Sequence, residues 1–339
     1  MAALSVLYPT LLDMAKRMDP DGKVDSIAEI LNETNEILDE MTWVEGNLPT
    51  GHRSTMRTGI PTPTWRKINQ GVQPTKSTTR QTTFNCGMLE AYAEIDKALA
   101  DLNGNTAAWR LSEERPFMEG ISQELADTVI YGNEGSEPEA FTGLTPYYNL
   151  STAESGDNLI LGGGSGSDNA SIWLVVWGPH IHGIIPKGSK AGLQMSDKGL
   201  VTIEDASGGS NTGRMEAYRT HYRFDAGLAV RDWRYAVRIC NIDKSELTRV
   251  YTSGTFSTGA NLPDLMFQAM RRVPSLSAGR ASFYMSRDIA TWVARQTAAL
   301  GYSTIPANAI AGDRAHTERF NGIPMRRVDA MAADEALVA

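Results

Sequence analysis

The sequence predicts an α+β fold with a long extended arm, and three observations support this prediction. Thr42–Gln81 is rich in Thr, Arg, Gly and Pro and holds few aliphatic residues, so it cannot bury a core of its own. Pro116–Tyr131 has the apolar spacing of a helix, and Ile172–Val176 has the composition of a strand. An arm that lacks a core needs a partner molecule.

Composition narrows the class of protein. The 339 residues are enough for a sizeable core in two subdomains, and 41% apolar with 21% charged residues is ordinary for a folded soluble chain. The 32 basic and 40 acidic residues give a net charge of -8. This excludes a protein that grips nucleic acid along its whole surface.

The sequence predicts a protein of a reducing compartment that has no membrane-spanning segment. Cys86 and Cys240 are too few for a disulfide framework or a thiolate zinc site. The N-terminus lacks the pattern of a signal peptide, and no window is apolar over the roughly 18 to 20 residues of a membrane span. We therefore expect a protein made and kept in the cytoplasm.

The N-terminal segment, residues 1–41, is predicted to be a second arm that contains an amphipathic helix. Between Val24 and Met41, apolar residues recur at helical spacing, with polar and acidic residues between them. The acidic residues of this segment are Glu29, Glu33, Glu36, Asp39 and Glu40.

Residues 42–87 are predicted to form a two-stranded β-hairpin arm. Gly and Pro residues interrupt the outgoing half at many points, for example at Gly59 and Pro61. From Thr78 to Met88 the pattern becomes extended, with Thr82, Phe84, Cys86 and Met88 on one face. This stretch is the predicted returning strand.

Two helices are predicted after the arm. Met88–Leu102 places Leu89, Tyr92 and Ile95 at intervals of three, and Asn103-Gly104 then acts as a stop signal. The stronger prediction is Pro116–Tyr131, in which Pro suits the first helical position and Gly132 follows the last. A helix of roughly 16 residues is about 24 Å long, enough to form the backbone of a subdomain.

The stretch 151–311 is predicted to be mixed α and β. Its glycine-rich run, Gly162–Ser167, lacks the Lys-Ser or Lys-Thr pair and the following helix that a phosphate-binding loop needs, so we interpret it as a flexible turn. The predicted strands are Ile172–Val176, Arg219–Val230 and Tyr235–Cys240, and the predicted helices are Leu262–Val273 and Ser286–Leu300.

His180 and His182 are the candidate metal ligands. Two imidazoles two residues apart on a strand point to the same side and can share a metal ion. The cupin barrel, where such a pair is familiar, also needs a Glu shortly afterwards, and Gly183–Lys187 offers none. We therefore expect structural or surface histidines, and no Gly-x-Ser-x-Gly elbow between a strand and a helix supports a nucleophilic serine. Neither a cofactor nor a catalytic residue is predicted.

The candidate interaction residues are the basic residues of the arm. A nucleic-acid site would interleave aromatic residues among them, and only Trp65 lies there. A solvated hairpin is the plain alternative. We favour contact with the acidic surface of an identical neighbour, for which the N-terminal acidic residues are a candidate receptor. The basic residues are Arg53, Arg57, Arg66, Lys67, Lys76 and Arg80.

The order of these parts resembles the major capsid proteins of tailed bacteriophages, whose fold is shared with the herpesvirus capsid floor. The run Trp43–Asn47, the stretch Glu119–Gly132 ahead of Phe141–Leu144, and the closing phrase FNGIPMRRVD at Phe320–Asp329 all resemble that family. The resemblance is greatest to short-tailed phages whose coat chain is not trimmed during maturation. It implies an N-terminal arm at 1–41, an extended loop at 42–87, a peripheral domain at 88–150 and 312–339 with a spine helix, and an axial domain at 151–311.

The resemblance also implies a function and partners. Hexamers and pentamers would form around the axial domain, and the extended loop would overlap the neighbouring subunit. The icosahedral head would enclose double-stranded DNA in loose contact with this acidic chain, with a scaffolding protein, a portal and a decoration protein as partners. Some relatives join neighbours by an isopeptide from a loop lysine. Lys67 and Lys76 lie in that loop, but no motif identifies the other residues, so we expect a non-covalent lattice.

Two other functions remain open on the sequence. A small metal-binding enzyme would use His180 and His182. A phage tail or receptor-binding protein would form a small soluble oligomer and would leave the basic arm unexplained.

Overall fold

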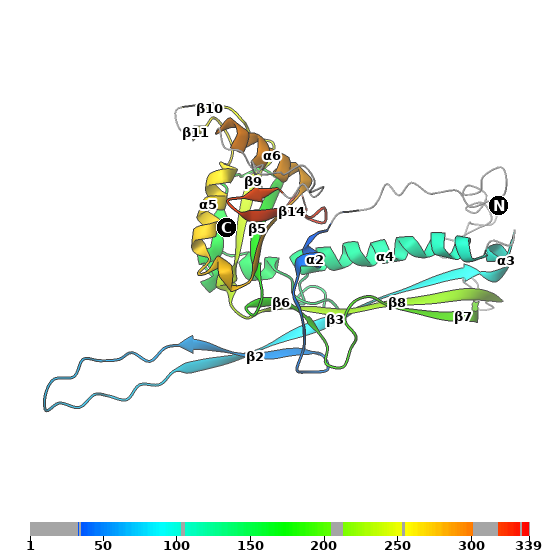
Figure 1. Ribbon diagram of the computed structural model, residues 1–339, viewed down its shortest axis with the longest axis horizontal. Helices are drawn as coiled ribbons and strands as arrows, with labels where there is room; N and C mark the ends of the chain where they lie inside the picture. The colour runs from blue at the N-terminus through cyan, green and yellow to red at the C-terminus, as the bar shows by residue number, and fades with distance from the viewer. Residues whose placement is uncertain are drawn as a thin grey trace.

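The computed structural model describes residues 33, 35–102, 106–204, 213–252, 255–300, 318–332 and 334–338. Figure 1 shows a compact part that holds the C-terminus, an elongated part built on one long helix, and an arm that projects from the opposite end. Each of the two larger parts contains its own six-stranded sheet. The predicted α+β class is therefore confirmed.

The compact part is built on the sheet β13-β14-β12-β5-β9-β4. Its central strands are buried along their whole length, as continuous apolar runs predict. Trp173 and Trp177 in β5 are almost fully enclosed, together with Phe283 and Tyr284 in β12. The strand bounds are Leu159–Leu161 (β4), Asn169–Trp177 (β5), Ala236–Asp243 (β9), Arg280–Met285 (β12), Arg319–Phe320 (β13) and Ile323–Arg327 (β14).

Two helices cover this sheet, and both were predicted. The helix α5, Leu262–Arg272, begins at Asn261, whose side chain accepts a hydrogen bond from the Asp264 amide. The helix α6, Arg287–Ala299, follows Ser286. Both helices contribute apolar side chains to the core that the sheet lines. A short hairpin, β10 (Tyr251–Thr252) with β11 (Thr255–Phe256), lies nearby.

The segment predicted as the closing strand, Phe320–Asp329, forms most of a two-stranded hairpin. Strands β13 and β14 are joined by Asn321-Gly322, and both turn residues have positive φ, 48° and 87°. Such a turn favours the Asn-Gly pair, which adopts positive φ at low cost. Strand β14 then pairs in parallel with β12, which brings the C-terminal region onto the compact sheet.

The elongated part is a second sheet covered by the helix α4, Thr106–Tyr131. Its strand order is β1-β6-β8-β3-β2, and β7 pairs with the first half of β8. Ala93, Ile121 and Tyr222 form one of the small cores between helix and sheet. The bounds are Trp43–Glu45 (β1), Gly51–Gly59 (β2), Thr78–Asp96 (β3), Ile181–Ile185 (β6), Gln194–Glu204 (β7) and Arg214–Val230 (β8).

The predicted helix at Met88–Leu102 is wrong. Strand β3 continues to Asp96 and pairs with β8 from Cys86 to Asp96, and only Lys97–Ala100 (α3) is helical. Leu89, Ala91 and Ala93 share the face toward α4, so the stretch also has the period of two that a strand requires. Eleven paired residues outweigh a local helical preference.

The spine helix is confirmed, but its predicted start at Pro116 is wrong. The helix begins at Thr106 and encloses Pro116 in its interior. The first turns are held by Trp109, which is buried against Ile95 and Leu99. Near the N-terminus, the structure describes only α2, Ile37–Glu40, and most of the predicted helix Val24–Met41 lies outside the described residues.

The predicted division into an axial and a peripheral domain remains a prediction, and strand pairing crosses its boundaries. Strand β8 comes from the segment 151–311, yet it pairs with β3 beside the spine helix. Strand β14 comes from 312–339, yet it pairs with β12 of the compact sheet.

Candidate intersubunit surface of the arm

The base of the arm is firmly anchored to the elongated sheet. Strand β2 pairs with β3 from Gly51↔Asn85 out to Gly59↔Thr78, which matches the predicted hairpin. Ser54 is buried and accepts a hydrogen bond from Nε of Arg231 at 2.8 Å. The side chain of Asn47 makes two hydrogen bonds with the backbone of Arg53, at 2.7 and 2.8 Å. These contacts fix the direction in which the arm leaves the body.

Beyond Gly59 the arm has no strand pairing, and we call residues 60–77 the arm tip. Its end is a turn in which the Gln70 amide donates to the Lys67 carbonyl at 3.2 Å. Asn69 in this turn has φ 65°, a conformation that Asn tolerates better than most residues. Figure 1 shows the tip far from both folded parts.

The arm tip exposes large apolar side chains. Trp65 is 103% exposed, Ile68 90% and Ile60 84%, more than any other large apolar residue among those described. Trp65 was expected only as a lone aromatic residue among the basic residues of the arm, and the two isoleucines were not predicted as exposed. An apolar residue in a stretch that has no core to bury it was a usable signal of an interaction site.

The structure places all six predicted basic residues on the exposed surface of the arm. Arg53 and Arg57 lie on β2, Arg80 lies on β3 opposite Met56, and the other three belong to the arm tip. Arg53 donates from Nε to the Thr83 hydroxyl. Within the described ranges, none of the six forms an ion pair with a carboxylate of its own chain. The structure does not gather them into one cluster, so their role in a contact stays a prediction.

The proposed receptor in the N-terminal segment is wrong for two of its residues. Arg326 pairs with Glu40 at 2.6 Å and with Glu36 at 3.0 Å. Glu40 is also buried and accepts a hydrogen bond from the Tyr284 hydroxyl at 2.9 Å. These carboxylates are neutralised within their own chain and cannot receive a neighbour's arm. Glu33 and Asp39 are described without such pairing, and Glu29 lies outside the described residues.

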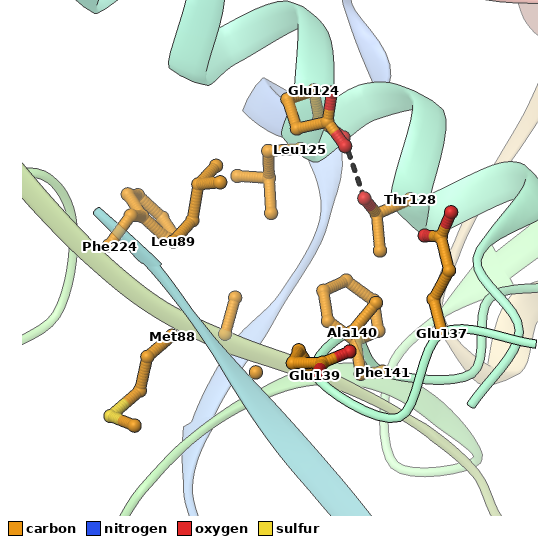
Figure 2. Close-up of a pocket in the computed structure, with 12 residues that line it drawn as sticks. Met88, Leu89, Glu124, Leu125, Thr128, Glu137, Glu139, Ala140, Phe141 and Phe224 are labelled. Atoms are coloured by element: carbon orange, nitrogen blue, oxygen red, sulfur yellow. Dashed lines mark hydrogen bonds between the residues drawn. The ribbon is translucent and has the colours of Figure 1, made fainter. Parts of the chain in front are cut away.

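A carboxylate-rich hollow that sequence analysis missed lies under α4. It has a volume of about 410 Å³ and opens to solvent. Figure 2 shows Leu89 and Phe224 from the sheet facing Leu125 from the helix across it, with Phe141 closing one side. Glu124, Glu137 and Glu139 stand at its rim. These residues come from four separate segments, namely β3, β8, α4 and the segment after α4, so no local motif could have found the hollow.

His180 and His182 lie in different surroundings. His180 stacks on Tyr235 at 3.9 Å between ring centroids, just before β6. His182 is buried inside β6, and its ring lies 6.0 Å from that of His52 on β2. In the portion of the chain that the structure describes, no three His, Cys, Asp or Glu residues are grouped so that they could hold a metal ion.

The glycine-rich run and the cysteines have structural surroundings. The amides of Gly162 and Gly164 donate to β9 carbonyls at 2.7 and 2.8 Å, so the run is fastened to the compact sheet. Cys86 and Cys240 are free thiols, and burial raises the pKa of each to about 11. None of the described helices is both long enough and apolar enough to span a membrane.

Comparison with known proteins gives a consistent result. A chain of the cryo-EM structure of bacteriophage epsilon15 is 33% identical, with 100% of both chains covered and a TM-score of 0.76. Chains of lower similarity include one of Microbacterium phage Oxtober96, at 13% identity, 68% and 98% coverage and a TM-score of 0.42. Another belongs to an encapsulin complex of Synechococcus elongatus PCC 7942, at 10% identity, 69% and 95% coverage and a TM-score of 0.43. No curated protein matches the chain.

A fold with a projecting arm and a spine helix, together with 33% identity to the epsilon15 chain over its whole length, defines a structural coat protein of a tailed bacteriophage. The chain belongs to the family described as major capsid protein GP7, whose model matches residues 19–339. It is a structural component of the virion shell, in which it assembles with itself, and it is not an enzyme. The enzyme alternative is thereby removed.

Proposed function

We propose that this capsid protein assembles as hexamers and pentamers into an icosahedral head, and that the arm, Thr42–Gln81, is the main contact between neighbouring subunits within them. The observation that carries the proposal is the arm tip. It projects from an anchored base, exposes Trp65 and Ile68, and makes no ion pair within the described chain. In a monomer the apolar side chains of this tip stay exposed to water, whereas assembly into a shell can bury them.

The charge distribution supports the same contact. The arm, Thr42–Gln81, carries six basic residues and a single acidic one, Glu45, on a chain whose net charge is -8. A basic arm on an acidic body attracts the body of an identical copy and disfavours contact between two arms. The six basic residues named above are the proposed contact residues.

The remaining roles follow from this assembly. We propose that residues 151–311 form most of the axial domain around the capsomer axis, and that 88–150 with 312–339 form the peripheral domain. The acidic chain would line packaged double-stranded DNA in loose contact, which lets the DNA leave. Assembly would take place in the host cytoplasm with a scaffolding protein and a portal, and a decoration protein would reinforce a non-covalent lattice.

Deletion of the arm tip tests the proposal. Residues 60–77 are replaced by Asn-Gly, which joins the paired residues Gly59 and Thr78 by a two-residue hairpin and leaves the anchored base intact. Full-length and shortened proteins are compared by sedimentation and electron microscopy, with scaffolding protein added to both. We expect shells, or rings of five and six, only from the full-length chain.

A matched control separates loss of the contact from loss of the fold. The shortened protein should keep the unfolding midpoint of the full-length monomer, because the arm tip contributes no buried contact within its own chain. Shells of normal yield from the shortened protein would contradict the proposal that the arm makes the main contact. A small oligomer from the full-length chain, even with scaffolding protein, would contradict assembly into a head.

A further inference from the structure

We propose that the arm tip of one copy docks in the hollow beneath α4 of the next copy, with Trp65 and Ile68 on its apolar floor and Arg66 and Lys67 at its carboxylate rim. We call this hollow the acidic groove and define it by Leu89, Leu125, Phe141, Glu124, Glu137 and Glu139. The inference rests on the proposed function and names the surface that receives the arm.

The shape of the acidic groove suits an extended segment. Its main cavity of about 410 Å³ lies within the usual range of pockets that enclose a bulky group. A second hollow of about 340 Å³ continues from it along α4, and the two share Leu89 and Glu124. An aromatic ring fits the first hollow, and the chain that follows has a path along the helix.

The chemistry of the groove matches that of the arm tip. The floor is apolar, formed by side chains of β3, β8 and α4. Glu124, Glu137 and Glu139 are exposed, and no Lys or Arg within the described ranges pairs with them. The arm tip offers the complement, a fully exposed indole followed directly by Arg66 and Lys67. Aromatic and arginine side chains are the groups that protein interfaces favour as anchors.

The carboxylates near the groove repel one another. Burial, followed by the charges of Glu124, Glu137 and Glu33, raises the pKa of Asp127 on the same helix. A cation brought to this rim relieves the repulsion, whereas an anionic partner increases it. The negative electrostatic potential of these carboxylates therefore favours a basic segment as the occupant of the groove.

The occupant is another copy and not the same chain. The arm leaves the sheet at Gly59 and runs away from α4, so its tip lies at the opposite end of the molecule from the spine helix (Figure 1). Each copy then contributes its arm tip to one neighbour and receives the arm tip of another neighbour in its groove. Such a one-way contact passes from copy to copy and closes into a ring when the rotation permits, which is the geometry of a hexamer or pentamer.

Zero-length carbodiimide coupling of the unmodified protein tests this docking. The reagent joins a lysine amine to a carboxylate only when the two are in contact. Particles assembled from the full-length chain are coupled, digested and analysed by mass spectrometry. We expect a bond from Lys67 to Glu124, Glu137 or Glu139 in particles, reduced at least tenfold in unassembled protein at the same concentration. The Lys67→Arg variant, which keeps the charge but lacks the amine, must lose this product.

Exchange of the charges provides a second readout. Lys67→Glu and Glu139→Lys should each lower the yield of particles, and the double variant should recover most of it. Asp334→Lys, at an exposed carboxylate of the C-terminal segment that does not line the groove, is the matched control for added positive charge and should not restore assembly of Lys67→Glu.

The outcomes separate this inference from the proposed function. Particles in which Lys67 couples to other carboxylates or to none would overturn the docking and leave the capsid assembly standing. A full-length chain that forms no particles with scaffolding protein would overturn the proposed assembly and the docking together.

Discussion

Arg238 and Glu335 form a buried ion pair, with 2.8 Å between Nη2 and Oε2, that fastens the C-terminal segment to the compact sheet. Glu335 also accepts hydrogen bonds from Ser171 in β5 and, at 2.6 Å, from the hydroxyl of Tyr131. Tyr131 is the last residue of α4. One carboxylate therefore links the end of the spine helix, the compact sheet and the C-terminus.

Removal of this carboxylate should be costly. Glu335→Ala leaves the guanidinium of Arg238 buried without its charge partner, and breaking such a pair typically costs about 3–5 kcal/mol. We expect a loss of this size in the free energy of unfolding of the unassembled protein, measured in urea. The control is Asp334→Ala at the exposed neighbouring position, which should change the free energy by less than about 0.5 kcal/mol. Equal losses in the two variants would contradict this assignment.

Replacement of Gly120 in α4 should stabilise the protein. A Cβ atom at this position meets nothing within 4 Å, and Gly in a helix costs roughly 0.5–1 kcal/mol relative to Ala. Gly120→Ala should therefore raise the free energy of unfolding by about that amount. Gly132→Ala, at the end of the same helix, is the opposite case, because its Cβ would lie 2.5 Å from the Thr128 carbonyl oxygen. Thermal unfolding should show shifts of opposite sign, and shifts of the same sign would contradict the described end of α4.

The base of the arm should be sensitive to acid. Burial, with the charge of Arg231, lowers the pKa of His52, and burial is also the main cause that lowers the pKa of His182. Above their usual pKa of about 6.5, both histidines are neutral in the folded and in the unfolded chain. Below it, the unfolded chain binds protons first, so stability falls as the pH drops toward the lowered folded-state pKa values. Unfolding in urea at pH 7.5 and pH 5.5 measures the loss.

Removal of the two imidazoles checks the source of that loss. The double variant His52→Gln with His182→Gln should lose less stability than the unaltered protein between these two pH values. His180, which stacks on Tyr235, is left unchanged in this double variant. An unchanged pH dependence in the double variant would place the sensitivity elsewhere.

Mature particles should dissolve into single chains in detergent. The arm contact is expected to consist of apolar burial and ion pairs, without a covalent bond. A denaturing gel of particles should show one band at 36.9 kDa. Ladders of higher mass that resist boiling and reducing agent would show that a cross-link forms.

The local pattern of the chain predicts its elements where one signal acts alone. The strand at Ile172–Val176 and the helix at Leu262–Val273 are found because nothing competes with their spacing. Met88–Leu102 carries both a helical spacing and a period of two, and its pairing with β8, more than a hundred residues away, decides between them. Pro116 is a plausible helix start by itself, but burial of Trp109 extends α4 ahead of it.

Of the candidate interaction surface, the arm could be predicted from the sequence but its receptor could not. A basic arm without a core is visible in the sequence, because six cations and few aliphatic residues fall in one continuous stretch. The receptor of the arm could not be predicted from the sequence. Glu36 and Glu40 have no basic partner nearby in the sequence, and only the C-terminal hairpin brings Arg326 beside them. The acidic groove needs β3, α4 and the segment after α4 to meet, so only the folded chain reveals it.

The most direct test of the central claim is a cryo-EM reconstruction of particles assembled from the full-length chain. We predict rings of six and five subunits in which residues 60–77 of each subunit lie on its neighbour, with the side chain of Trp65 enclosed. Density for the arm tip that projects freely into solvent, or folds back on its own subunit, would contradict the claim that the arm joins the shell.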